Sequence, residues 1–161
     1  MYKRQPLTVV VNGDRKVEAD ETFKVQLSAP TGASLGDFIG VGTILNDDLP
    51  TIRINDVSKN EGNSGPTAYT FTVALSAAST EAVTVRYVTA NGSALAGSDY
   101  TAVPLTTLTF SPGQTTRTFT VKGRGDVTVE ANETFSVNLS APDGATLLDS
   151  QGVGTILNDD R

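Results

Sequence analysis

Residues 17–48 of this chain read VEADETFKVQLSAPTGASLGDFIGVGTILNDD, and residues 129–160 read VEANETFSVNLSAPDGATLLDSQGVGTILNDD. The two stretches align without a gap at an offset of 112 residues, and 24 of their 32 positions are identical. An offset of this size is that of a whole domain, because the repeats of solenoid proteins are only about 20–50 residues long. The chain is therefore organised around a domain-sized repeat.

The repeat extends further towards the N-terminus, where TVVVNGD (8–14) aligns with TVKGRGD (120–126) at the same offset. We expect residues 50–160 to form one complete repeat. Residues 6–48 are then the C-terminal half of a truncated repeat of the same kind, and the chain is a fragment of a longer tandem array. Residues 1–5 (MYKRQ) differ in character from the Val/Thr-rich text after them and are interpreted as a non-native leader.

The complete repeat is rich in β-branched residues that alternate with a period of two, which is typical of half-buried strands. Strands are predicted at TIRINDV (51–57), AYTFTVALS (68–76), VTVRYVTA (83–90), LTTLTFS (105–111), TTRTFTVKG (115–123), ETFSVNLSA (133–141) and GVGTILN (152–158). Seven short strands separated by Gly, Pro, Asn and Asp predict an all-β fold, a seven-stranded immunoglobulin-like antiparallel β-sandwich. The inward face of the last strand is ambiguous, because Val153 and Ile156 imply opposite faces. Gly42 and Gly154 are expected to permit a close approach of the backbone.

Composition excludes several classes of function. The chain has no cysteine and no histidine, so it has neither disulfides nor a Cys or His nucleophile, base or metal ligand. Its formal net charge of -6 argues against nucleic acid as a partner, since proteins that bind nucleic acid carry a basic face. No stretch approaches the roughly 20 apolar residues that a transmembrane helix needs.

The acidic residues are expected to gather at one end of the sandwich. Each connection of an antiparallel sandwich reverses the chain, so successive loops alternate between the two ends. Loops 58–67, 91–104 and 124–132 and the chain end 158–160 then share one end, here called the lower pole, and the other end is the upper pole. We expect Glu61, Asp99, Asp126, Glu130, Glu133, Asp159 and Asp160 at the lower pole, and only Glu81, Asp143 and Asp149 at the upper pole. Lys59, Lys122 and Arg124 are also expected near the lower pole.

Carboxylates crowded in this way repel one another unless a cation lies between them. Calcium suits such a site, because it accepts about 6–8 oxygen ligands in flexible geometry, whereas magnesium demands a stricter octahedron. Asn and Asp are also ordinary turn residues, and each acid taken alone is explained by solvation. The convergence of four separate segments on one pole favours the metal site.

Five segments of the chain resemble the Calx-beta domain: EGNSG (61–65), NGSALAGSDY (91–100), LTFSPGQ (108–114), GDVTVEANETF (125–135) and GTILNDD (154–160). That family includes the calcium-binding domains of sodium/calcium exchangers, a domain of an integrin β subunit and tandem arrays in large bacterial surface proteins. The resemblance covers residues 50–160, and residues 7–48 as a half domain.

The resemblance implies a calcium cluster at the lower pole. Matched residue by residue, its ligands are Glu61, Asn91, Asp126, Glu130, Glu133, Asn158, Asp159 and Asp160. Positions 91, 125 and 158, which are acidic in the family's strongest pattern, carry Asn, Gly and Asn here, so we expect fewer or weaker ions. The half domain retains Asp14, Glu18, Glu21, Asn46, Asp47 and Asp48 without counterparts of Glu61 and Asn91, and is expected to bind calcium poorly.

The function predicted from these observations is a calcium-binding structural and interaction module of an extracellular or membrane-associated repeat protein, in which calcium stiffens the domain junctions. Its partners are then neighbouring repeats of the same chain, and another surface protein or a matrix component. Two alternatives stay open: a metal-free spacer of an adhesin stalk, and a non-catalytic accessory domain of a larger secreted enzyme. A glycosidase that uses Glu130 and Glu133 is disfavoured, because both lie in one loop without an aromatic sugar platform.

Overall fold

A computed structural model describes residues 5–14 and 16–161, so that the predicted leader lies outside the described residues except for Gln5. The chain divides into two compact units, an N-terminal unit of residues 1–48 and a C-terminal unit of residues 49–161. The described residues form strands and loops without a helix, which confirms the all-β prediction. Accordingly, the described part of the chain has no helix of the length and apolarity needed to cross a membrane.

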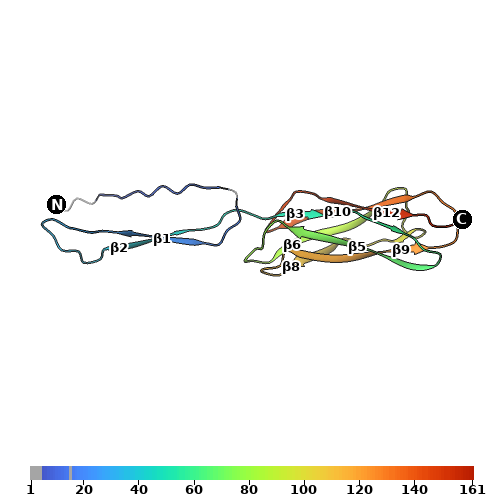
Figure 1. Ribbon diagram of the computed structural model, residues 1–161, viewed down its shortest axis with the longest axis horizontal. Helices are drawn as coiled ribbons and strands as arrows, with labels where there is room; N and C mark the ends of the chain where they lie inside the picture. Colours follow the sequence, from blue (N-terminus) through green and yellow to red (C-terminus); the bar gives the residue numbers. More distant parts are fainter. Residues whose placement is uncertain (1–4, 15) are drawn as a thin grey trace. The chain divides into compact units, whose positions relative to one another are not determined.

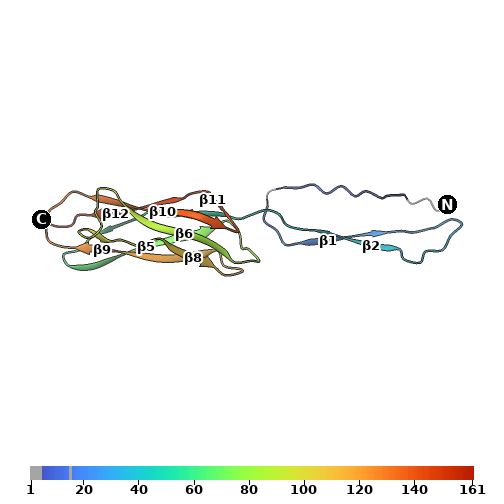
Figure 2. The same cartoon turned by 180° about the vertical axis from the view of Figure 1, so that it is seen from behind.

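The C-terminal unit is a sandwich of two five-stranded sheets (Figure 1, and from behind in Figure 2). The first sheet has the spatial order β4 (Val57–Asn60), β12 (Gln151–Leu157), β10 (Glu133–Asp143), β6 (Val83–Asn91) and β8 (Thr106–Phe110). The second has the order β11 (Thr146–Leu147), β3 (Thr51–Ile54), β5 (Gly65–Leu75), β9 (Thr116–Gly125) and β7 (Tyr100–Thr101).

The count of seven strands requires correction, because the predicted first strand (51–57) is two strands in two different sheets. Two polar side chains account for the crossover between them. Asn55 accepts a hydrogen bond from the backbone N–H of Thr72 in β5, and Asp56 accepts one from the N–H of Val153 in β12 at 2.7 Å. The sandwich is also not purely antiparallel, since β4 runs parallel to β12 and β11 runs parallel to β3.

The core lies between the two sheets and is centred on aromatic rings. Tyr69 and Phe71 of β5 are fully buried, as their alternation with threonines predicted. The ring of Phe135 in β10 stacks on Tyr100 with centroids 4.6 Å apart and meets Tyr69 edge-on at 5.7 Å. Such pairs contribute roughly 0.5–1.5 kcal/mol beyond the area they bury. Tyr100 also holds the loop that precedes it, through this stacking and through the hydrogen bond that its hydroxyl donates to Asn91.

The structure shows which face of the last strand, β12, points into the core. Gly152, Gly154 and Ile156 face the core, whereas Val153 is half-buried on the other side. A Cβ at Gly154 would lie 2.2 Å from Cζ of Phe135. The aromatic ring therefore occupies the place of a side chain, so the group that approaches Gly154 closely is the ring of Phe135 and not another backbone segment.

The N-terminal unit contains one antiparallel hairpin, β1 (Glu21–Gln26) and β2 (Ile39–Ile44). Its register places Phe23 opposite Gly42, as β10 and β12 place Phe135 opposite Gly154. The Phe23 ring fills the space beside Gly42, where a Cβ would lie 2.3 Å from Cζ of Phe23. Repeated sequence thus gives repeated pairing, and the interpretation of this unit as a truncated repeat stays a prediction.

Candidate metal centre

The acidic segments meet at the lower pole of the C-terminal unit, where β4, β9 and β12 end and β10 begins. The N–H of Glu61, one residue after β4, donates to the carbonyl of Leu157 at the end of β12, with a donor–acceptor distance of 3.1 Å. Gly65 at the start of β5 pairs with Gly125 at the end of β9. These pairings bring the segments around Glu61, Asp126 and Asp159 together, as the loop-parity argument predicted.

Glu61 is the only buried polar or charged residue of the described chain, with 5% of its surface exposed. No described residue donates a hydrogen bond to its carboxylate, although its backbone carbonyl accepts one from the hydroxyl of Thr67. Burial raises the pKa of this carboxyl, and the nearby charges of Asp126 and Asp160 raise it further. A buried acid without a partner disfavours its own ionised form.

The chain end places two aspartates beside Glu61. Asp159 accepts hydrogen bonds from the N–H of Gly62 at 3.1 Å and from the amide of Asn60 at 3.3 Å. Asp160 accepts one bond, from the amide of Asn63 at 3.1 Å, through Oδ1. Its Oδ2 is buried and has no hydrogen-bond partner among the residues that the structure describes. Burial and the neighbouring carboxylates also raise the pKa of Asp160.

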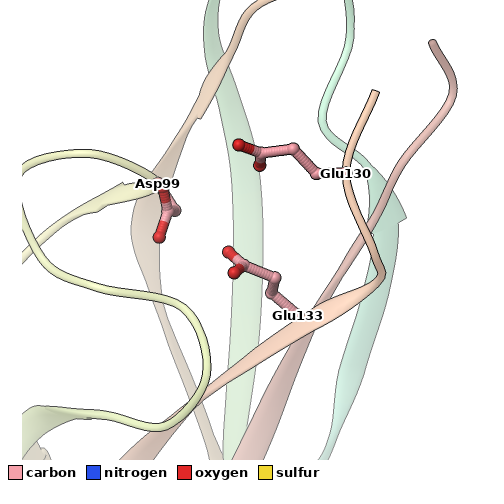
Figure 3. A group of neighbouring side chains, drawn as sticks. All are labelled: Asp99, Glu130 and Glu133. Carbon is pink, nitrogen blue, oxygen red and sulfur yellow. The ribbon is translucent and has the colours of Figure 1, made fainter. Parts of the chain in front are cut away.

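Glu130, Glu133 and Asp99 form a second group of carboxylates at the same pole (Figure 3). One oxygen of each lies within 4.8 Å of those of the other two. Burial raises the pKa of Glu133 to about 7, and the carboxylates of Asp99 and Glu130 contribute to this shift. Asp126, by contrast, accepts a bond from the N–H of Thr128, which lowers its pKa and favours the ionised form.

Two asparagines of the predicted ligand set already use their side-chain oxygens. Asn91 accepts hydrogen bonds from the N–H of Ala96 at 3.0 Å and from the hydroxyl of Tyr100 at 2.7 Å. Asn158 accepts one from the N–H of Glu130 at 3.2 Å, and its amide donates to the carbonyl of Asp160. Both hold the loops that carry the acids.

Basic side chains do not balance these acids. Across residues 5–14 and 16–161, the one ion pair within 4.0 Å joins Lys16 to Glu18 in the N-terminal unit. Lys59, Lys122 and Arg124 therefore neutralise none of the pole's carboxylates at that distance. The donor set consists of oxygens alone, one of them buried and orphaned, which fits a hard divalent cation such as calcium.

The N-terminal unit reproduces part of this arrangement. Asn46 accepts a hydrogen bond from the N–H of Glu18 at 3.0 Å, as Asn158 does from Glu130. A pocket at this position is lined by Asp14, Lys16, Glu18, Glu21, Asn46, Asp47 and Asp48, among other residues. Lys16 stands where the C-terminal unit has Thr128, and its ammonium group already contacts Glu18. An exposed lysine thus contacts one of the acids of the half site, and poor calcium binding there stays a prediction.

Comparisons with known proteins agree with this architecture. The sequence model of the Calx-beta domain matches residues 2–56 and 46–160. Extracellular matrix protein 3 of Lytechinus variegatus is 30% identical over an alignment 143 residues long, and the match covers 83% of this chain but only 5% of that protein. The solved apo-form Calx CBD1 domain has a TM-score of 0.62 at 23% identity, and covers 70% of this chain and 100% of its own. The calcium binding domain CBD12 of CALX1.1 has a TM-score of 0.61 at 23% identity, and covers 68% of this chain and 46% of its own.

Proposed function

This chain belongs to the Calx-beta domain family, and on that premise we propose that its C-terminal unit binds calcium at the lower pole. In this proposal the unit is a structural module of a larger extracellular or membrane-associated repeat protein, and it has no catalytic role. The name of the Lytechinus relative, an extracellular matrix protein, supports the extracellular location.

The observation that carries the proposal is the buried carboxylate of Glu61. It is 5% exposed, receives no hydrogen bond from the described residues and is surrounded by the charges of other acids. Partial removal of an ionised group from water, without a hydrogen-bond partner to compensate, is unfavourable. A bound cation offsets this cost and also gives Oδ2 of Asp160 a partner.

The carboxylates proposed to hold calcium are those of Glu61, Asp126, Glu130, Glu133, Asp159 and Asp160. Asn91 and Asn158 complete the set predicted from the sequence. Their oxygens accept hydrogen bonds within the loops, so we assign them chiefly to positioning the acids. With these amides in place of charged ligands, the affinity should lie towards the weak end of the range for calcium modules, about 10⁻⁴–10⁻³ M for extracellular ones.

The biological role that we propose is to stiffen the junctions of a tandem array and so to control its contacts with a matrix component or another surface protein. The acidic segment 158–160 follows β12 directly, and in the N-terminal unit the equivalent Asp48 stands two residues before Pro50, where the next repeat begins. A cation bound at the end of one repeat would restrict the hinge to the next repeat.

Thermal melting of the whole chain tests calcium binding. After treatment with chelator, calcium at 100 times its Kd should stabilise the C-terminal unit by about 2.7 kcal/mol. Magnesium is the matched control and should stabilise it less, because it requires octahedral geometry. A melting temperature that calcium leaves unchanged would favour the metal-free spacer. X-ray scattering with calcium and with chelator tests the hinge separately, and identical profiles would reject the stiffening role.

A further inference from the structure

The lower pole contains an acid that resemblance did not assign to the metal site. We propose that Asp99, and not Asn91, is the ligand that the 91–104 loop contributes, and that Asp99, Glu130 and Glu133 together hold one cation. This inference rests on the proposed calcium-binding function and specifies which residues perform it.

The geometry of the three carboxyl groups is the first support. Oxygens of Asp99, Glu130 and Glu133 lie within 4.8 Å of one another, and the three side chains point into one common space (Figure 3). Calcium bonds its oxygen ligands at about 2.3–2.6 Å, so oxygens on opposite sides of one ion are separated by about twice that distance. The separations in this group therefore suit a shared ion with only small movements of the side chains.

The backbone fixes the position of Asp99. Its carbonyl accepts a hydrogen bond from the N–H of Arg124 in β9 at 2.8 Å, and its own N–H donates to the carbonyl of Leu95 at 3.0 Å. The next residue, Tyr100, is 1% exposed and stacks on Phe135 in the core. Asp99 Oδ2 accepts a bond from the N–H of Leu95 at 2.7 Å, and a side-chain hydrogen bond with Asp99 contributes to the raised pKa of Glu133.

Asn91 has a different task in the same loop. Its Oδ1 accepts two hydrogen bonds, from Ala96 and Tyr100, and so closes the loop that carries Asp99. The chain that follows is pressed against the start of β10, since a Cβ at Gly92 would lie 2.4 Å from the carbonyl oxygen of Thr134. Binding a metal through Asn91 would require both of its bonds to weaken, whereas Asp99 needs no such change.

Glu61 supplies an independent indication that a cation belongs beside this group. Its side chain is more than nine-tenths buried and unpartnered among the described residues, and Glu130 acts electrostatically upon it. Its charge in turn acts on Glu133. The buried, unpartnered acid therefore lies at the same pole as the three proposed ligands, near enough for its charge to act on Glu133.

The test is a calorimetric calcium titration of the whole chain and of its D99N variant. Asparagine retains an oxygen that can accept the Leu95 bond, so loop closure should persist. Loss of a group in the outer shell of a metal costs roughly 10–100-fold in affinity, and loss of a direct ligand should cost at least about tenfold. The apo melting temperature should stay the same or rise, because one repelling charge is removed; a merely structural role for Asp99 would lower it. D143N, at the upper pole, is the matched control and should bind as the wild type does.

Two results would overturn the assignment while leaving the proposed function intact: a wild type that binds calcium together with a D99N variant of equal affinity, or an N91D variant that tightens binding by about tenfold or more. The second measurement stands even if D99N folds poorly, because N91D leaves Asp99 in place. A wild type that binds no calcium would reject the proposed function itself, and the assignment with it.

Discussion

Replacement of Glu61 by Gln should change the stability of the C-terminal unit in opposite directions with and without calcium. At pH 7.5 the apo protein must keep a carboxylate that is 5% exposed among the charges of Asp126, Asp160, Glu130 and Asp159. Gln has nearly the same shape and removes the charge. The variant should therefore be more stable than the wild type in chelator and should gain less from calcium.

The magnitudes follow from burial and from ligand linkage. An unsatisfied buried polar group costs about 1–3 kcal/mol, and more when it is charged. Because the buried Gln amide also carries such a cost, the net stabilisation of the apo unit by E61Q should be about 1–2 kcal/mol. For a domain of this size, 1 kcal/mol corresponds to roughly 4 °C in Tm. Calcium at 100 times the wild-type Kd contributes about 2.7 kcal/mol to the wild type, and about 1.4 kcal/mol to a variant that binds tenfold more weakly.

Differential scanning calorimetry in chelator and in saturating calcium measures both effects on one pair of proteins. E81Q is the matched control, because it removes the same charge from an exposed side chain at the upper pole. It should change either Tm by the equivalent of no more than about 0.5 kcal/mol. The reasoning fails if E61Q lowers the apo Tm and leaves the calcium increment at its wild-type value.

Three further predictions follow from the packing and the acids. G154A should destabilise the C-terminal unit by about 1–3 kcal/mol in urea unfolding, because its Cβ would lie 2.2 Å from Phe135, whereas G40A, whose Cβ meets nothing closer than 4.0 Å, should cost far less. G125D should lower stability without tightening calcium binding, since a Cβ there would lie 1.8 Å from the carbonyl oxygen of Gly62; a stable variant with higher affinity would disprove this. The apo Tm should fall as the pH rises from about 4.5 to 7.5, because the pKa of Glu133 is about 7 in the folded state and lies near 4.3 in an unfolded chain, so the folded state binds the extra proton in that window. In saturating calcium the Tm should instead rise with pH at the upper end of that window. An apo Tm that does not change with pH would contradict the raised pKa of Glu133.

Much of the fold could be predicted from periodicity alone. The alternation in β5 placed Tyr69 and Phe71 in the core, and the two copies of the sequence repeated at offset 112 pair their strands, β1–β2 and β10–β12, in the same register. The break at Asn55 and Asp56 could not be predicted, because these residues act through backbone groups of β5 and β12 that are distant in sequence. The sequence pattern of two adjacent polar residues is the same whether the strand ends there or the chain crosses from one sheet to the other.

The candidate metal centre could likewise be predicted only in part. Counting chain reversals placed the acids at one pole, and the pairing of β9 with β5 and of β10 with β12 agrees with that placement. Sequence does not reveal which oxygens are already occupied. From sequence alone, Asn91 could bind a metal or could close its loop by hydrogen bonds. The bonds that it accepts from Ala96 and Tyr100 indicate that it closes the loop. Chain reversals predict that Asp99 lies at the lower pole. They do not predict that it lies close to Glu133, because that distance depends on the fold of the whole loop.

The most direct test of calcium binding at the lower pole is an isothermal calorimetric titration of the chelator-treated whole chain with calcium at pH 7.5. We predict saturable binding with a Kd of about 10⁻⁴–10⁻³ M, dominated by the C-terminal unit, that E61Q weakens and E81Q does not. The absence of saturable heat up to several millimolar calcium, together with an unchanged melting temperature, would contradict it.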